Sequence, residues 1–150
     1  MLAPRMMAAL LLVAACGAAE DVRIDLADAD GDCAARFADV ATLSIEAVAT
    51  AGRCRLAHEC AFNVAVGSVA DVEAALRISD VLLELSSGEA QTLVINGRPS
   101  RDCFPRADGS NRPVLCGYGS LGQARDGTLV IELEADTGGA ECPESIDLCP

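Results

Sequence analysis

Short segments in which apolar and polar residues alternate are the feature that most constrains how this 150-residue chain can fold. Alternation with a period of two places the apolar side chains on one face of an extended strand, so each segment predicts a half-buried β-strand. Gly, Pro, Asn or Asp residues stand between many of these segments and indicate turns. We expect about seven strands, at residues 22–26, 42–47, 62–66, 81–85, 92–95, 117–125 and 128–134.

One segment has the period of an amphipathic helix instead. Ser68 stands directly before residues 69–77, and Asp71 follows it three positions later, which resembles a capping box at a helix start. We therefore expect one short α-helix of two to three turns over residues 69–77. The residues that share its apolar face are Val69, Val72 and Leu76.

Two dipeptides predict tight turns at the ends of expected strands. Asn96-Gly97 follows the strand at 92–95, and Asp126-Gly127 separates the last two segments, as in a hairpin with a primed turn. A loop rich in proline and glycine is expected between them, from Arg98 to about Leu115. The residues of the last strand expected to face the core are Leu129, Ile131 and Leu133.

These elements predict a mostly β fold, an antiparallel β-sandwich that is immunoglobulin-like in the broad sense and forms a single domain over residues 21–150. A parallel α/β sheet would need repeated crossover helices, and the pattern shows one helix. The chain has no Trp, so the core Trp of antibody-type domains is absent.

The charge of the chain limits the classes of partner that it can bind. The net charge is −12, and all 11 basic residues are Arg. Binding of phosphate backbones needs clustered basic residues, so we expect no nucleic-acid partner. The lack of Lys excludes Schiff-base chemistry and P-loop phosphate binding.

The N-terminus has the pattern of an export signal. Arg5 precedes an uncharged and mostly apolar run over residues 6–15. This run is too short to cross about 30 Å of hydrocarbon, which takes roughly 20 helical residues. Its length and flanks are typical of a secretory signal peptide.

Val13-Ala14-Ala15-Cys16 resembles the lipobox of bacterial lipoproteins. The resemblance implies that residues 1–15 are removed, that Cys16 is acylated and binds the lipid bilayer, and that residues 16–20 form a short tether. Gly17 stands where an Asp would retain the protein in the inner membrane, which favours the outer membrane, on its periplasmic face or at the cell surface. The alternative is ordinary secretion, with cleavage after Ala15 or Ala19.

Seven cysteines remain beyond Cys16, and export would place them in an oxidising compartment where disulfides persist. Six of seven can form three bridges, and the sequence leaves the pairing open. Local spacing favours three pairs, while a bridge from Cys33 to the C-terminal pair is the competing arrangement. The pairs that spacing favours are Cys54–Cys60, Cys103–Cys116 and Cys142–Cys149. This pairing leaves Cys33 as a buried thiol or as a link between two molecules.

An acidic segment is the strongest candidate metal site. Counted from Asp28, residues Asp30, Asp32 and Asp39 fall on positions that resemble the calcium loop of EF-hand and dockerin-like proteins. Cys33 occupies the position where that loop needs Gly. The alternative interpretation is an acidic surface turn whose Asp side chains cap backbone amides. Ca²⁺ is therefore a candidate cofactor, and we expect no other cofactor.

Two further patterns are weaker. His58 lies between Cys54 and Cys60, but soft-metal sites show tighter Cys pairs and a fourth ligand, so a disulfide-bonded loop is favoured. Residues 117–122 fit GxGxxG, but a hairpin rather than a helix follows them. We find no catalytic constellation and expect a non-catalytic binding or structural role in the cell envelope, with an envelope protein as a candidate partner. The alternatives are a Ca²⁺-binding module and a hydrolase in which Asp, Glu, Ser or His58 converge.

Overall fold

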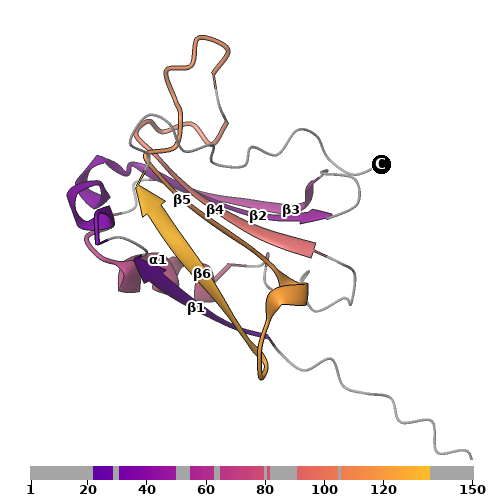
Figure 1. The fold of residues 1–150 in the computed structure, drawn as a ribbon. Coiled ribbons are helices and arrows are strands. Elements are labelled where there is room, and N and C mark those ends of the chain that lie inside the picture. Colours follow the sequence, from indigo (N-terminus) through magenta and orange to yellow (C-terminus); the bar gives the residue numbers. More distant parts are fainter. Residues whose placement is uncertain are drawn as a thin grey trace, which may run out of the picture.

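The computed structural model describes residues 22–28, 31–49, 55–62, 65–79, 81, 91–104 and 106–135. Six strands form one mixed sheet in the order β1-β6-β5-β4-β2-β3 (Figure 1). The strands are β1 (Arg23–Asp28), β2 (Thr42–Ala49), β3 (Arg55–Phe62), β4 (Gln91–Arg98), β5 (Leu115–Ser120) and β6 (Thr128–Ala135). The helices are α1 (Val69–Arg77) and the single-turn 3₁₀ helices η1 (Cys33–Ala35), η2 (Phe37–Asp39) and η3 (Leu121–Gln123).

The mostly β composition is confirmed, whereas the sandwich and its immunoglobulin-like topology are not. The described strands form a single sheet, and helices pack against it in place of a second sheet. The prediction of a wholly antiparallel arrangement is wrong, because β1 pairs with β6 in parallel. Alternation shows that one face of a strand is buried, but it does not identify the element that covers that face.

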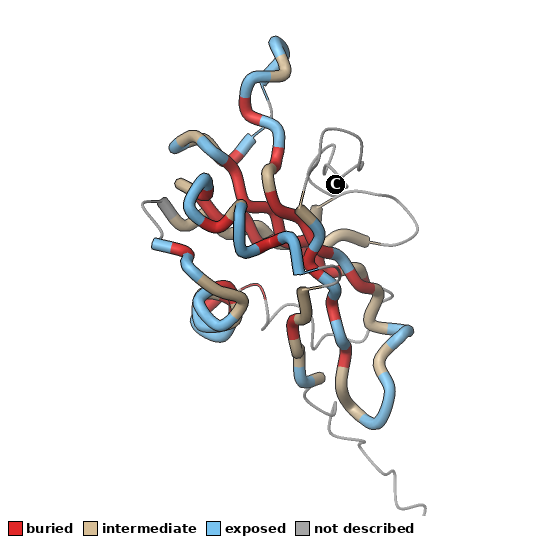
Figure 2. The backbone as a smooth tube through the Cα atoms, turned by 60° about the vertical axis from the view of Figure 1, so that its left-hand side comes forward, coloured by how far each residue is buried: buried red, intermediate tan, exposed pale blue. Residues whose placement is uncertain are grey.

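The hydrophobic core lies on one face of this sheet. Leu43 and Ile45 of β2 project to the same side as Ile95 of β4 and Leu133 of β6, and all four are at most 3% exposed. Buried side chains from α1, η1 and η2 pack against them. Figure 2 shows the buried residues running through the middle of the sheet and the outer side of α1 facing solvent.

The helix at residues 69–77 is confirmed with its predicted bounds. Ser68 is its N-cap, and the Ser68 side chain accepts a hydrogen bond from the backbone N–H of Asp71. Val72 and Leu76 are buried in the core. The Glu73 carboxylate accepts a hydrogen bond of 3.2 Å from the backbone N–H of Leu26, which attaches α1 to β1. No helix in the described part of the chain is long and apolar enough to span a membrane.

Three further predictions are wrong in the described residues. Val81, the first residue of the strand expected at 81–85, is helical. The third strand covers Arg55–Phe62 rather than residues 62–66, because β2 pairs with the segment that the spacing of Cys54 and Cys60 had assigned to a small loop. Asn96-Gly97 lies within β4 and does not form a turn. A Cβ at Gly97 would lie 2.9 Å from Val40 Cγ2, so glycine is needed here for close packing.

The turn and the last strand of the expected hairpin are confirmed, whereas its first strand, expected over 117–125, is not: β5 ends at Ser120 and η3 follows it. Asp126 and Gly127 have positive φ angles of 50° and 74°, as both central residues of a type I′ turn require. The turn joins η3 to β6, and β6 pairs with β5 in the antiparallel direction. The expected core residues of the last strand are at most 2% exposed, and they are Leu129, Ile131 and Leu133.

Candidate functional site: a buried polar sheet face

The second face of the sheet is polar at its centre and is nevertheless buried. Ser44 and Glu46 of β2 and Asn96 of β4 are 0%, 2% and 0% exposed. In the register of the sheet, Ser44 lies opposite Asn96 on one side and Cys60 on the other, while Glu46 lies opposite His58. The sheet thus brings together polar side chains from three neighbouring strands, which we call the polar cluster: Ser44, Glu46, His58 and Asn96.

A loop over residues 99–114, between β4 and β5, lies on the side of the polar cluster and is held by several contacts. Cys103 of this β4–β5 loop forms a disulfide with Cys60 of β3. Thr42 Oγ1 donates a hydrogen bond of 2.7 Å to the carbonyl of Ser100. Arg98 Nη1 donates one of 2.6 Å to the carbonyl of Asn111. The loop is therefore attached to all three strands that carry the polar cluster, β2, β3 and β4.

The Asn111 side chain also organises the β4–β5 loop from within. Its Nδ2 donates hydrogen bonds to the carbonyls of Asp102, at 2.7 Å, and Phe104, at 2.9 Å. Its Oδ1 accepts one of 2.6 Å from the Ser100 hydroxyl. Because these bonds join both halves of the loop, the segment around Phe104 has a defined conformation.

The observed disulfide corrects two predictions. Cys54–Cys60 and Cys103–Cys116 are both wrong, since Cys60 and Cys103 are bonded to each other, with 6.0 Å between their Cα atoms. Cys116 is also disulfide-bonded. Closeness along the chain did not predict the pairing, because the sheet register and the folded-back loop decide which cysteines meet.

Phe104 is the exposed aromatic residue of the β4–β5 loop. Its ring stacks on His58, with 5.2 Å between ring centroids and 24° between ring planes. The Arg55 guanidinium lies 5.0 Å from the centre of the same ring, a cation–π distance. Phe104 remains 46% exposed, so a fixed aromatic ring faces solvent at this position.

Glu46 and His58 form the titratable pair of the polar cluster. His58 Nε2 lies 3.8 Å from Glu46 Oε1, and the two side chains are 17% and 3% exposed. Burial lowers the pKa of His58 below 6.5, and the charges of Arg55 and Arg98 lower it further, against the opposing effect of Glu46 and Glu59. Burial therefore favours the neutral imidazole, which lies beside the buried carboxyl group of Glu46.

Five side-chain atoms of the polar cluster are buried without a hydrogen-bond partner in the described chain: Ser44 Oγ, Glu46 Oε2, His58 Nε2, Asn96 Nδ2 and Asn96 Oδ1. Each buried polar group left in this state costs about 1–3 kcal/mol. Five such atoms would cost about 5–15 kcal/mol, which is the whole stability of an ordinary domain.

Ser44 and His58 are not hydrogen-bonded to each other, so the nucleophile–base contact of a Ser–His pair is not formed here.

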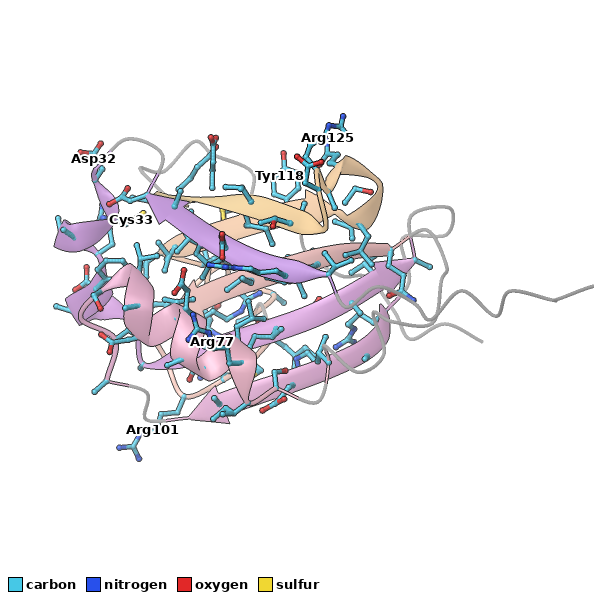
Figure 3. All side chains as sticks on the ribbon, turned by 90° about the horizontal axis from the view of Figure 1, so that it is seen from below. Asp32, Cys33, Arg77, Arg101, Tyr118 and Arg125 are labelled. Atoms are coloured by element: carbon cyan, nitrogen blue, oxygen red, sulfur yellow. A yellow bond between two sulfur atoms is a disulfide. The ribbon has the colours of Figure 1, made fainter. Side chains whose placement is uncertain are left out.

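The acidic segment is arranged differently from a calcium loop where it is described. Asp28 Oδ1 accepts hydrogen bonds from the backbone N–H groups of Gly31, at 2.9 Å, and Cys33, at 3.4 Å. Asp39 Oδ2 lies 3.5 Å from Arg36. Asp32 is exposed next to Cys33 (Figure 3), and Asp30 lies outside the described residues. Within the described ranges, no group of three or more His, Cys, Asp or Glu side chains could hold a metal ion.

Other predicted residues have simple positions. Cys33, which local spacing leaves over, is a buried thiol whose Sγ donates a hydrogen bond of 3.3 Å to the carbonyl of Leu133. Gly117 and Gly119 lie within β5, where a Cβ would be 2.7 Å and 3.0 Å from side chains of β6. The predictions that fall outside the described residues concern 1–15, Cys16, 16–20, Cys54, 82–85, Cys142 and Cys149.

Sequence reasoning missed two of the four residues of the polar cluster, Ser44 and Glu46. Glu46 and Ser44 occupy the polar positions of an alternating strand, which normally face water. His58 was singled out as the one histidine of the chain, and Asn96 as part of an Asn-Gly pair that was interpreted as a turn. The described residues define a six-stranded mixed sheet with an apolar face packed against helices and a polar face to which the β4–β5 loop is attached. Comparisons with protein-family models, with curated proteins and with solved structures found no match to this chain.

Proposed function

We propose that this chain is a lipid-anchored protein of the cell envelope with a non-catalytic binding role. Support for the anchor comes from the apolar leader and from Val13-Ala14-Ala15-Cys16, with acylated Cys16 in the outer membrane. The Cys60–Cys103 disulfide agrees with the oxidising compartment that export implies.

The contact surface in this proposal is the β4–β5 loop, and the observation that carries it is the fixed, exposed ring of Phe104. Exposed aromatic rings that are already ordered lose little conformational freedom on binding and are enriched among the residues that dominate interface energies. The disulfide at Cys103, the stacking on His58 and the Arg55 contact supply that order.

The charge of the loop indicates the chemistry of its partner. Residues 99–114 carry three Arg and two Asp, a net charge of +1, whereas the whole chain carries −12. Arg101, Arg106 and Arg112 are exposed, and Arg101 points away from the body of the protein (Figure 3). Complementary charge steers association, so the proposed partner is an envelope protein with an acidic surface.

Photo-crosslinking in intact cells tests the contact surface. A photoreactive phenylalanine analogue replaces Phe104 in the full-length protein, and the matched control carries it at Tyr118, an exposed aromatic of β5 that is 56% exposed. We expect one envelope protein with an acidic surface to be crosslinked from position 104 and not from 118. Arg101→Ser combined with Arg106→Ser should reduce the adduct several-fold. Equal adducts from both positions, or none from 104, would refute this contact surface.

The anchor is tested separately, by growth with labelled palmitate. The protein should carry the label, and Cys16→Ser should remove it. An unlabelled wild-type protein, or label that survives the substitution, would contradict the anchor without affecting the contact surface.

A further inference from the structure

We propose that the polar cluster lines an internal binding site for a small uncharged guest that carries hydroxyl groups, either water or a small polyol. The site lies on the face of β2, β3 and β4 to which the β4–β5 loop is attached. It is distinct from the exposed contact surface around Phe104, and nothing in the proposed binding role requires it.

The need for a guest follows from the buried polar atoms that have no hydrogen-bond partner in the described chain. Five polar atoms on three adjacent strands are buried without a hydrogen-bond partner in the described chain, at a total cost that a stable domain could not bear. Ser44 and Asn96 are directly paired across β2 and β4, and such pairs have Cβ atoms about 5 Å apart. Glu46 and His58 form the next pair, across β2 and β3. One small molecule, or a few waters, can therefore reach all four side chains.

The kind of guest follows from the atoms that lack partners. Glu46 Oε2 and Asn96 Oδ1 need a donor, Asn96 Nδ2 needs an acceptor, and the Ser44 hydroxyl can serve as either. A hydroxyl group donates and accepts at once, so it fits both kinds of atom. Metal ions satisfy acceptors only and would leave Asn96 Nδ2 without a partner.

The local charges favour an uncharged guest. The ionisable groups that act on His58 are Glu46 on β2, Arg55 and Glu59 on β3, and Arg98 on β4. Two carboxylates and two guanidinium groups balance, and burial favours the neutral imidazole. A cation or an anion in this site would disturb that balance, whereas water or a polyol leaves it unchanged.

The four side chains of the polar cluster are at most 17% exposed, so the site has little access to bulk solvent. The sheet register aligns Cys60, Ser44, Asn96 and Cys116 in one row across the sheet. Both cysteines at the ends of this row are disulfide-bonded, and the bond of Cys60 attaches the β4–β5 loop to this face beside Ser44. A guest that fits must therefore be small.

Water-selective nuclear Overhauser spectra test the proposal on the full lipidated chain, labelled with ¹⁵N and ¹³C, in detergent micelles. We expect cross-peaks from a slowly exchanging guest to the side-chain amide protons of Asn96 and to the β-protons of Ser44. Spectra recorded with and without added glycerol identify the source. Cross-peaks to water that persist in glycerol support bound water, and their replacement by cross-peaks to glycerol supports a polyol. No cross-peaks to either molecule would overturn the proposal.

Stability measurements provide an independent test. Ser44→Ala should lower the melting temperature by about 3–8 °C, since the guest loses a hydrogen bond. If Ser44 Oγ had no partner, its removal would leave the melting temperature unchanged or raise it, which would overturn the proposal. Val94→Ala is the control, because Val94 is 2% exposed on the same face, opposite Glu46, and is apolar. It should destabilise the protein and leave the guest cross-peaks at Asn96 intact.

Discussion

The disulfide between β3 and the β4–β5 loop should make a large contribution to stability, and its removal by Cys60→Ala combined with Cys103→Ala measures it. The two cysteines are separated by 43 residues. In the chain-entropy description of cross-links, closing a loop of that length stabilises the folded state by about 4 kcal/mol at 25 °C. The double variant should lose about this much free energy of unfolding.

Urea unfolding of the full-length protein, followed by circular dichroism, is the assay. With a denaturant slope of about 1–3 kcal/mol/M, the midpoint should fall by between about 1 and 4 M. Phe104→Ala is the matched control: it keeps the cross-link, removes the ring that stacks on His58, and should shift the midpoint far less because Phe104 is half exposed. A loss below about 1 kcal/mol in the double variant, or a Cys54–Cys60 peptide found by non-reducing digestion, would refute the reasoning.

Three further predictions concern packing, capping and pH. Gly117→Ala should lower the free energy of unfolding by about 1–3 kcal/mol, measured by calorimetry, because the new Cβ would lie 2.7 Å from Leu133 Cδ2 and 3.0 Å from a backbone oxygen. Gly122→Ala is the control and should be neutral, since the nearest atom to its Cβ would lie at 3.8 Å. Equal effects of the two substitutions would contradict the packing argument. Ser68→Ala should cost about 0.5–2 kcal/mol, since it removes the N-cap of α1, and an unchanged melting temperature would argue against that cap. His58 has a lowered pKa in the folded state, so its contribution to stability is complete above pH 6.5 and is lost as the pH falls through the folded-state pKa. His58→Gln should therefore flatten the pH dependence of unfolding below 6.5, and an unaltered profile would show that His58 is not responsible.

Local signals in the sequence predicted the elements whose structure depends on local physics. The helix at Val69–Arg77 was predictable because its cap and its apolar face lie within nine residues. The turn at Asp126-Gly127 was predictable because positive φ angles require those residue types. Both depend on interactions between residues that are near in the chain, which is what a sequence pattern records.

Features that depend on distant contacts were not predictable in the same way. Gly97 is a glycine because Val40 packs against it, although an Asn-Gly pair usually indicates a turn. Glu46 follows the pattern of a solvent-facing residue, yet the β4–β5 loop and the disulfide of Cys60 lie on the same face of the sheet. Glu46 is buried by contacts with residues that are distant in the sequence, and nothing in the sequence near Glu46 indicates them.

The parallel pairing of β1 with β6 has a consequence for the order of folding. Arg23 pairs with Thr128, about 100 residues further along the chain, and every other strand lies between them. Contacts between such distant residues are slow to form, because the intervening chain must first be ordered. An incomplete chain that ends before residue 128 would leave β1 without its neighbour and Leu26 without Ile131 beside it. The first strand of this domain therefore depends on the last, and a truncated chain would expose an aggregation-prone edge.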